Sequence, residues 1–169
     1  MDKNTITERM HQLESIIGYS FREIDYLSLA MNATKINSLG KGKHNKEYEN
    51  SGLATVGDAM LKAVLADYLY QNRSRNKGDI TIIKSTLENN INLTSISKDN
   101  GIRNFAYNQF HFADEPGIPD HEKVVNNYHD VYIEAIIGAI YYDKGFEEMK
   151  KWIIAWLLPR LTNNLSTMP

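Results

Sequence analysis

The chain has 169 residues, of which 42% are hydrophobic, and its formal net charge at pH 7 is −2. This length and apolar content suffice for one hydrophobic core and leave no room for two large domains, so we expect a single domain over residues 1–169. The absence of cysteine excludes disulfides and zinc–cysteine sites, and the small net charge excludes a protein that binds nucleic acid over its whole surface.

The spacing of the hydrophobic residues predicts an all-α protein. Thr5 or Thr7 is expected to cap the first helix, and the pair Asn100–Gly101 to end the fifth. Residues 105–127 lack clean periodicity, which predicts a long loop. The predicted helices lie around residues 10–17, 21–29, 53–72, 80–91, 93–100, 131–142 and 146–161.

The longest apolar runs, residues 136–142 and 153–158, are too short to span a bilayer. The first residues are polar and contain no apolar core of the kind found in signal peptides. We therefore expect a cytoplasmic protein that has no membrane partner.

Basic residues cluster in two predicted loops. Lys41 and Lys43 lie in the loop after the second helix, and Arg73, Arg75 and Lys77 lie after the third. Two such loops could contact phosphates across an RNA minor groove, where recognition depends on shape and backbone. The same charges also fit two solvated turns. From charge alone, that simpler interpretation is favoured.

Two longer motifs stand out. Residues 50–61 read Asn-Ser-Gly-Leu-Ala-Thr-Val-Gly-Asp-Ala-Met-Leu, and residues 134–145 read Glu-Ala-Ile-Ile-Gly-Ala-Ile-Tyr-Tyr-Asp-Lys-Gly. Both resemble signatures of the ribonuclease III family, which read roughly Asn-Glu-Arg-Leu-Glu-Phe-Leu-Gly-Asp-Ala-Val-Leu and Asp-x-x-Glu-Ala-Leu-Ile-Gly-Ala-Ile-Tyr-Leu-Asp-x-Gly. Residues 13–21, 27–31 and 78–87 match further family motifs in the same order. The resemblance implies the all-helical fold of a ribonuclease III endonuclease domain, and no segment resembles a double-stranded RNA-binding domain.

The resemblance also implies a carboxylate cluster that binds magnesium and cuts double-stranded RNA. The first signature keeps Asp58, but its two glutamates fall on Ser51 and Ala54. Magnesium prefers oxygen ligands, and positions 51, 54 and 58 share one face of a helix. Asp58 therefore lacks the carboxylates that would complete its side of the cluster.

The second signature keeps Glu134 but has Val131 in place of its aspartate, with Asp130 one residue earlier. Spacings of three and four residues both return to the same helical face, so Asp130 and Glu134 could still converge. A shift of one residue nonetheless turns a side chain by about 100°. We predict Asp58 and Glu134 as the catalytic and metal-binding residues, with Asp130 as a third candidate metal ligand. The helices around these two residues are expected to pack side by side. Their apolar faces would form the central core, with Val56, Met60 and Val64 on one helix and Ile133, Ile136, Ile137 and Ile140 on the other.

Two further departures concern the dimer and the charge of the site. The resemblance implies a homodimer in which an aromatic residue of the first signature helix inserts into the partner subunit, and that position is Thr55 here. A family glutamate just before Gly78 falls on Lys77. We still expect a homodimer through the face of the signature helix.

The dipeptide His129-Asp130 also admits a metal-dependent phosphohydrolase of the all-helical HD type, with His111, His121 and Asp143 as further ligands. A single His-Asp pair is common by chance. The upstream histidines fall in the irregular loop, so loop-anchoring or surface histidines explain them more simply.

Two functions stay open for the resemblance. In the first, the chain acts on double-stranded RNA in RNA processing with lost or strongly reduced cleavage, because Ala54 and Val131 supply no ligand oxygens. The alternative is an active, divergent magnesium-dependent endonuclease that uses Asp58, Glu134 and Asp130. Any bound metal is expected to be magnesium, with manganese as a substitute. The expected partners are double-stranded RNA, a second copy of the chain and, for a scaffold, another protein.

Overall fold

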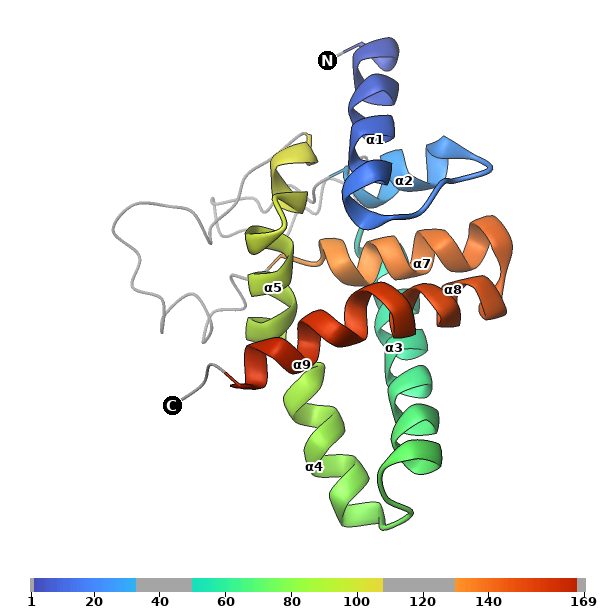
Figure 1. Cartoon of the computed structure of the whole chain (residues 1–169). Helices are drawn as coiled ribbons and strands as arrows, with labels where there is room; N and C mark the ends of the chain where they lie inside the picture. Colours follow the sequence, from blue (N-terminus) through green and yellow to red (C-terminus); the bar gives the residue numbers. More distant parts are fainter. Residues whose placement is uncertain (1, 33–49, 108–129, 167–169) are drawn as a thin grey trace, which may run out of the picture.

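The computed structural model describes residues 2–32, 50–107 and 130–166 (Figure 1). Across these ranges the chain is helical and forms no strand, apart from one isolated bridge between Asn32 and Tyr107. The prediction of an all-α fold is confirmed. The elements are α1 (Lys3–Ile17), α2 (Ile24–Ala30), α3 (Ser51–Asn72), α4 (Lys77–Leu87), α5 (Asn90–Asp99), the 3₁₀ helix η2 (Ile102–Phe105), α7 (Tyr132–Lys144), α8 (Phe146–Trp152), the π-helical segment η4 (Ile153–Leu157) and α9 (Leu158–Ser166).

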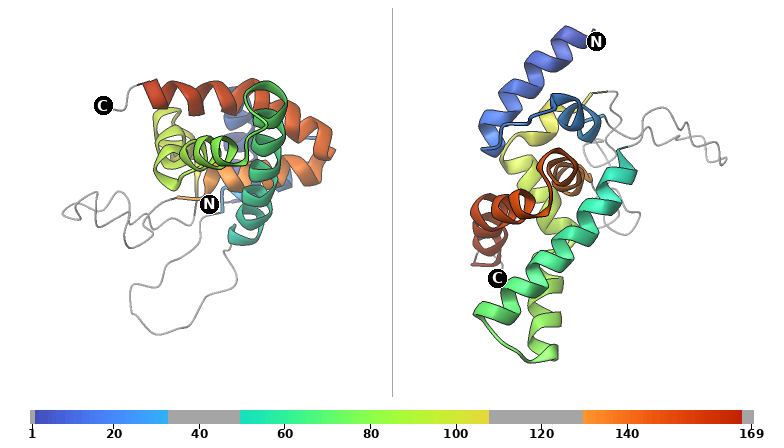
Figure 2. Two further views of the ribbon diagram at one scale, coloured as in Figure 1. Left: turned by 90° about the horizontal axis from the view of Figure 1, so that it is seen from below. Right: turned by 90° about the vertical axis from the view of Figure 1, so that its right-hand side faces the viewer.

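The two signature helices, α3 and α7, cross at the centre of the fold and share the largest interface in it. Figure 2 shows α7 end-on against the long diagonal of α3. Glycine makes this crossing close: a Cβ on Gly57 would overlap the carbonyl oxygen of Glu134, and a Cβ on Gly138 would overlap that of Leu53. The predicted side-by-side packing of these two helices is confirmed.

The core face of α3 differs from the sequence prediction. Val64 is buried as predicted, but Val56 and Met60 are only half-buried. The close approach at Gly57 turns its own face of the helix toward α7, so Leu53 and Leu61 are the residues that point inward. On α7 the predicted apolar face is buried completely, over Ile133, Ile136, Ile137 and Ile140.

Two helix boundaries were predicted wrongly because polar side chains set them. Asp2 caps α1 by accepting from the backbone N–H of Thr5 at 3.0 Å, so neither Thr5 nor Thr7 is the cap. The fourth helix ends at Leu87, not near residue 91, because Asn89 caps a new helix by accepting from the N–H of Asn92 at 2.8 Å.

The last predicted helix contains the π-helical segment η4, and its two tryptophans, one at the end of α8 and one in η4, bond to the end of α1. The indole N–H of Trp152 donates to the carbonyl of Ile17 at 2.8 Å, and that of Trp156 to the carbonyl of Ile16 at 3.2 Å. These bonds fasten the C-terminal helices across the end of α1. No helix in the described ranges combines the length and the apolar character needed to cross a lipid bilayer.

Candidate functional site

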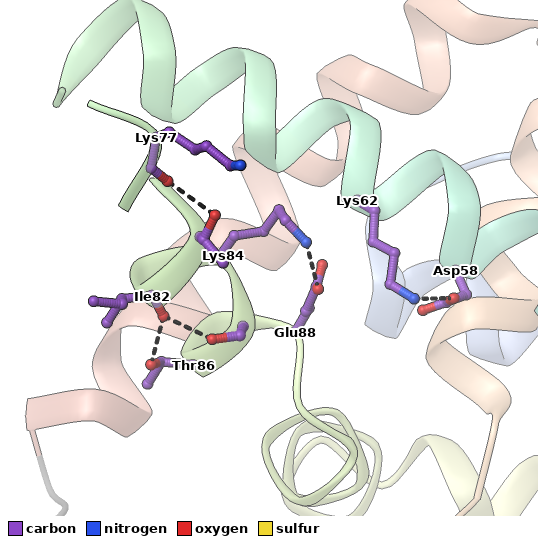
Figure 3. Close-up of polar contacts among 9 residues, drawn as sticks. Asp58, Lys62, Lys77, Ile82, Lys84, Thr86 and Glu88 are labelled. Carbon is purple, nitrogen blue, oxygen red and sulfur yellow. Dashed lines mark hydrogen bonds and ion pairs between the residues drawn. The ribbon is translucent and has the colours of Figure 1, made fainter. Parts of the chain in front are cut away.

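Asp58 follows the close-packed Gly57 on α3, at the edge of the crossing with α7. Its Oδ2 accepts from the ammonium of Lys62, one turn further along α3, at a distance of 2.6 Å (Figure 3). The Asp58 side chain is 42% exposed, so solvent reaches this ion pair. The carboxylate that the first signature keeps therefore already has a cationic partner within its own helix.

Glu134 lies in the first turn of α7, three residues after the N-cap Val131, and is only 5% exposed. Its Oε2 is buried and has no hydrogen-bond partner among the described residues. Burial, together with the negative charges of Asp130 and Asp58, raises the pKa of Glu134 to about 8. Gly57, the neighbour of Asp58, lies against the backbone carbonyl of Glu134, so the two signature residues lie near each other. The raised pKa, caused mainly by burial, leaves Glu134 protonated at neutral pH.

Asp130 is the buried partner of Arg103, a residue of η2. Its Oδ2 accepts from Nε of Arg103 at 3.0 Å and from Nη2 at 2.6 Å. Burial raises the pKa of Asp130, whereas the charge and hydrogen bonds of Arg103 lower it. Two charge-assisted hydrogen bonds to a buried guanidinium hold this carboxylate in place, so Asp130 serves here as an anchor between η2 and the start of α7.

A further acidic group, Glu88, lies near Lys62 and was not among the residues predicted from the sequence. Glu88 follows the end of α4 and accepts from the ammonium of Lys84 at 2.7 Å, with both side chains mostly buried. The hydrogen bond to Asp58 raises the pKa of Lys62, and the charges of Asp58 and Glu88 add to that shift. Lys62 therefore lies within the electrostatic reach of two carboxylates, one on α3 and one at the end of α4 (Figure 3).

The structure describes all three positions at which the signatures have carboxylates and this chain does not. Ser51 is the first residue of α3 and is half-buried, Ala54 is 6% exposed, and Val131 is the N-cap of α7 without a side-chain cap bond. Within residues 2–32, 50–107 and 130–166, no three His, Cys, Asp or Glu side chains come together to hold a metal. The donor set that the structure describes does not fit the magnesium cluster that the signatures imply.

The predicted RNA-binding residues divide into two groups. Lys41 and Lys43 lie outside the described residues. Arg73, Arg75 and Lys77 lie in the turn between α3 and α4 and at the start of α4, and all three are exposed. Lys77 and Lys84 lie with Lys62 along the seam between these two helices (Figure 3).

The HD-type alternative finds no support in its described residues. Asp143 accepts from the hydroxyl of Tyr19 and from the backbone N–H groups of Arg22 and Glu23, at 2.8 to 3.0 Å. It therefore fixes the segment between α1 and α2, while Asp130 is paired with Arg103. His111, His121 and His129 lie outside the described residues.

Two groups of this site follow from signals in the sequence. Lys62 and Lys84 are each four residues from an acid, which is the spacing of an ion pair on one helical face. Arg103 stands in a short apolar segment between Ile102 and Phe105, where an arginine needs an acidic partner. The identity of that partner, Asp130, cannot be read from the sequence, because the two residues are 27 positions apart.

Comparison with known proteins gives consistent matches over this architecture. A family model described as "Ribonuclease-III-like" matches residues 28–161. Ribonuclease 3 of Caenorhabditis briggsae is 30% identical over 93% of this chain and 14% of its own length. The Vibrio cholerae enzyme is 29% identical over 92% of this chain and 64% of its own, and the Francisella philomiragia enzyme 32% identical over 88% and 58%. The chain thus spans less than two thirds of the length of these relatives.

Solved structures show the same fold. The nuclease domain of ribonuclease III from Campylobacter jejuni matches with a TM-score of 0.64 at 22% identity, covering 91% of this chain and 96% of that one. That structure is described for its flexibility in a region involved in dimer formation. A second structure of the same nuclease domain matches with a TM-score of 0.63 at 21% identity.

Proposed function

The chain belongs to the ribonuclease III family, and on that basis we propose that it binds double-stranded RNA through the site at the α3–α7 crossing and cleaves it slowly or not at all. The processing or protection of structured RNA would then depend on binding, and cleavage would be a minor activity. A homodimer is part of this proposal, with the exposed face of α3 as its interface.

The state of the carboxylates carries the proposal. Ala54 and Val131 offer no oxygen where the signatures have acidic residues, and Asp58 is already paired with Lys62. Hydrolysis of a phosphodiester by this family's chemistry depends on charge stabilisation in the transition state, and each lost ligand removes part of it. We expect the missing oxygens at Ala54 and Val131 to prevent efficient hydrolysis even where the fold is intact.

Support for RNA binding comes from the basic end of the seam between α3 and α4. Arg73, Arg75 and Lys77 are exposed at the turn between α3 and α4, and the guanidinium of Arg75 lies over the ring of Tyr70 at 5.4 Å. Contacts between basic side chains and phosphates supply most of the affinity for a duplex and depend little on its sequence. A basic end beside a site in which Asp58 is paired with Lys62 and Glu134 holds its proton suits binding better than hydrolysis.

Support for the dimer comes from the exposed face of α3. Gly52, Thr55, Ala59 and Ala63 recur on that face and are exposed, which allows a second helix to approach closely. The Campylobacter jejuni nuclease domain is described as having a region involved in dimer formation. We expect the corresponding helix of this chain to meet its own copy.

The direct test is to incubate the purified chain with a perfect RNA duplex in magnesium and to measure binding and cleavage in the same samples. We expect a salt-dependent complex and little or no cleavage. Glu134→Gln should leave binding unchanged, because the buried side chain is already uncharged at neutral pH. Robust cleavage that Asp58→Asn or Glu134→Gln abolishes would overturn the proposal.

One observation favours the alternative of an active, divergent endonuclease. The Oε2 atom of Glu134 is buried without a hydrogen-bond partner among the described residues, as an unused ligand would be. Asp130 would have to leave Arg103 to join it. Cleavage in manganese that disappears in Asp130→Asn would establish this alternative, because manganese tolerates an imperfect ligand set better than magnesium.

A further inference from the structure

We propose that this site binds the RNA backbone without any divalent cation, because basic side chains of the chain itself neutralise its carboxylates. The inference deepens the proposed function and rests on duplex RNA binding. It names the mode of binding: a built-in set of ammonium and guanidinium groups takes over the charge-neutralising task that bound metal ions perform in a carboxylate cluster.

The first step is that acidic groups on three different elements each have a basic partner. Among the residues that the structure describes, no three acidic side chains come together around one point, as a metal site would need. The pairs, with the shortest N–O distance, are Lys62 with Asp58 (2.6 Å), Lys84 with Glu88 (2.7 Å) and Arg103 with Asp130 (2.6 Å).

The second step concerns the cost of admitting a metal. A divalent cation at Asp58 would have to displace the ammonium of Lys62 from Oδ2 or bind Oδ1 next to that ammonium. Lys62 is anchored to the same helix, so its positive charge would stay close to the ion and repel it. Glu134 is buried beside this pair, and Ala54 and Val131 add no oxygen to compensate for the repulsion.

The third step concerns the phosphate. A row of carboxylates repels an RNA backbone unless cations neutralise it. From Asp58 to Glu88 the chain carries five basic and four acidic residues, a net charge of +1, and the excess of basic residues lies at the turn between α3 and α4. Such a seam attracts phosphates by itself, and each lysine contact contributes to a salt-dependent affinity.

The fourth step identifies the group that contacts the ligand. Arg103 is buried and paired with Asp130, so it is not the side chain that meets the ligand. Lys62 is 48% exposed, and the hydrogen bond to Asp58 uses only one of its three ammonium donors. Lys62 is therefore the side chain that reaches a phosphate oxygen. Lys84 and Lys77 continue the line of lysines along α4 toward the basic turn (Figure 3).

The test measures the affinity for a labelled RNA duplex by fluorescence anisotropy, with EDTA and separately with magnesium. We expect the two dissociation constants of the unmodified chain to agree within about twofold, in contrast to a metal-bridged complex. Lys62→Ala should weaken binding roughly three- to tenfold and lower the slope of log K against log salt by about one. Lys151→Ala is the control, since Lys151 forms a similar pair with Glu148 on α8 and should not change either quantity.

The Asp58→Asn variant separates the two possibilities by the direction in which its affinity for RNA changes. If Lys62 is the resident cation, removing its carboxylate frees the ammonium, and RNA binding should become tighter in EDTA and in magnesium alike. If Asp58 instead binds a metal that bridges to the RNA, the same variant should bind more weakly in magnesium. Both lysine variants alter exposed positions, and circular dichroism should confirm that they fold.

A second measurement uses no RNA. Manganese is titrated into the full chain and followed by electron paramagnetic resonance, and we expect no bound ion. A manganese site that Asp58→Asn removes would overturn the inference, as would RNA binding that vanishes in EDTA, and either result leaves the proposed function standing. Absence of RNA binding in both buffers would instead overturn the proposed function together with this inference.

Discussion

Glu134 is the clearest case of a residue whose chemistry is set by burial. Its pKa is raised from 4.5 to about 8, mainly by the loss of solvent around the carboxyl group. The folded state therefore holds the proton more tightly than the unfolded chain. The resulting stabilisation is complete below the unfolded pKa near 4.5 and is lost as the pH rises through about 8.

We therefore predict that Glu134→Gln removes a pH dependence from stability. Between pH 5 and 8 the free energy of unfolding of the unmodified chain should fall relative to that of the variant by up to about 1.4 kcal/mol per pH unit. Asp58 and Asp130 contribute to this shift through their charges, so the decline should be smaller in Asp58→Asn. Urea unfolding at several pH values measures the difference, and parallel pH profiles for the two proteins would contradict the prediction.

At the scale of elements, the close crossing of α3 and α7 depends on a single missing side chain. Gly57→Ala places a methyl group on the backbone carbonyl of Glu134, which has no flexible end that could move away. We expect this variant to lose about 3 kcal/mol or more of stability, at the upper end of overpacking costs. Thermal and urea unfolding measure the loss.

Gly52→Ala is the matched control on the same helix. Its new methyl group meets no atom within 4 Å, and the position is exposed. Alanine favours helix over glycine by up to about 1 kcal/mol, so this variant should be as stable as the unmodified chain or slightly more so. If both substitutions had equal effects, the crossing would not be as close as the structure shows.

The elements also show which features of the fold the sequence can predict. Apolar periodicity located the helices, because burying one face is what each of them needs. It placed Val56 and Met60 at the centre of the core, whereas both are only partly buried, since the glycine contact with α7 determines the inward face of α3. That contact joins residues far apart in the chain, and no local pattern encodes it.

The candidate site also has features that the sequence predicts and features that it does not. Loss of the signature carboxylates at Ala54 and Val131 was visible in the sequence, because it depends only on residue identity. The partners of the remaining acids were not predicted. Whether Asp130 faces Glu134 or Arg103 depends on where η2 docks, and the buried guanidinium is the stronger attraction for a carboxylate that has left water.

For the whole molecule, the exposed small-residue face of α3 leads to a prediction about assembly. We expect light scattering to give about twice the chain mass of 19.4 kDa. Ala59→Arg should convert the dimer to a monomer, because a long charged side chain prevents the close approach of two helices. Ala155→Arg, at an exposed position outside α3, should leave the mass unchanged. A monomer at high concentration of the unmodified chain would count against the dimer.

The site draws residues from α3, α4, η2 and α7, so regaining a metal requires changes on more than one element. Ala54→Glu and Val131→Asp return the two lost carboxylates, and Asp at the N-cap of α7 also suits that helix start. Ala54 is only 6% exposed, so a glutamate at this position must extend toward Asp58 and solvent to be tolerated. Because the ammonium of Lys62 is bound to the carboxylate of Asp58, we predict that these two changes alone restore little metal affinity.

Adding Lys62→Ala to this pair should free Asp58 and produce a manganese site detectable by electron paramagnetic resonance, together with a gain in duplex cleavage. The double variant that keeps Lys62 is the matched control and should bind manganese at least tenfold more weakly, as expected for a fixed positive charge close to the ion. Equal manganese affinity in the double and triple variants would show that the ammonium of Lys62 does not compete with the metal. The proposed role of Lys62 as resident cation would then be wrong.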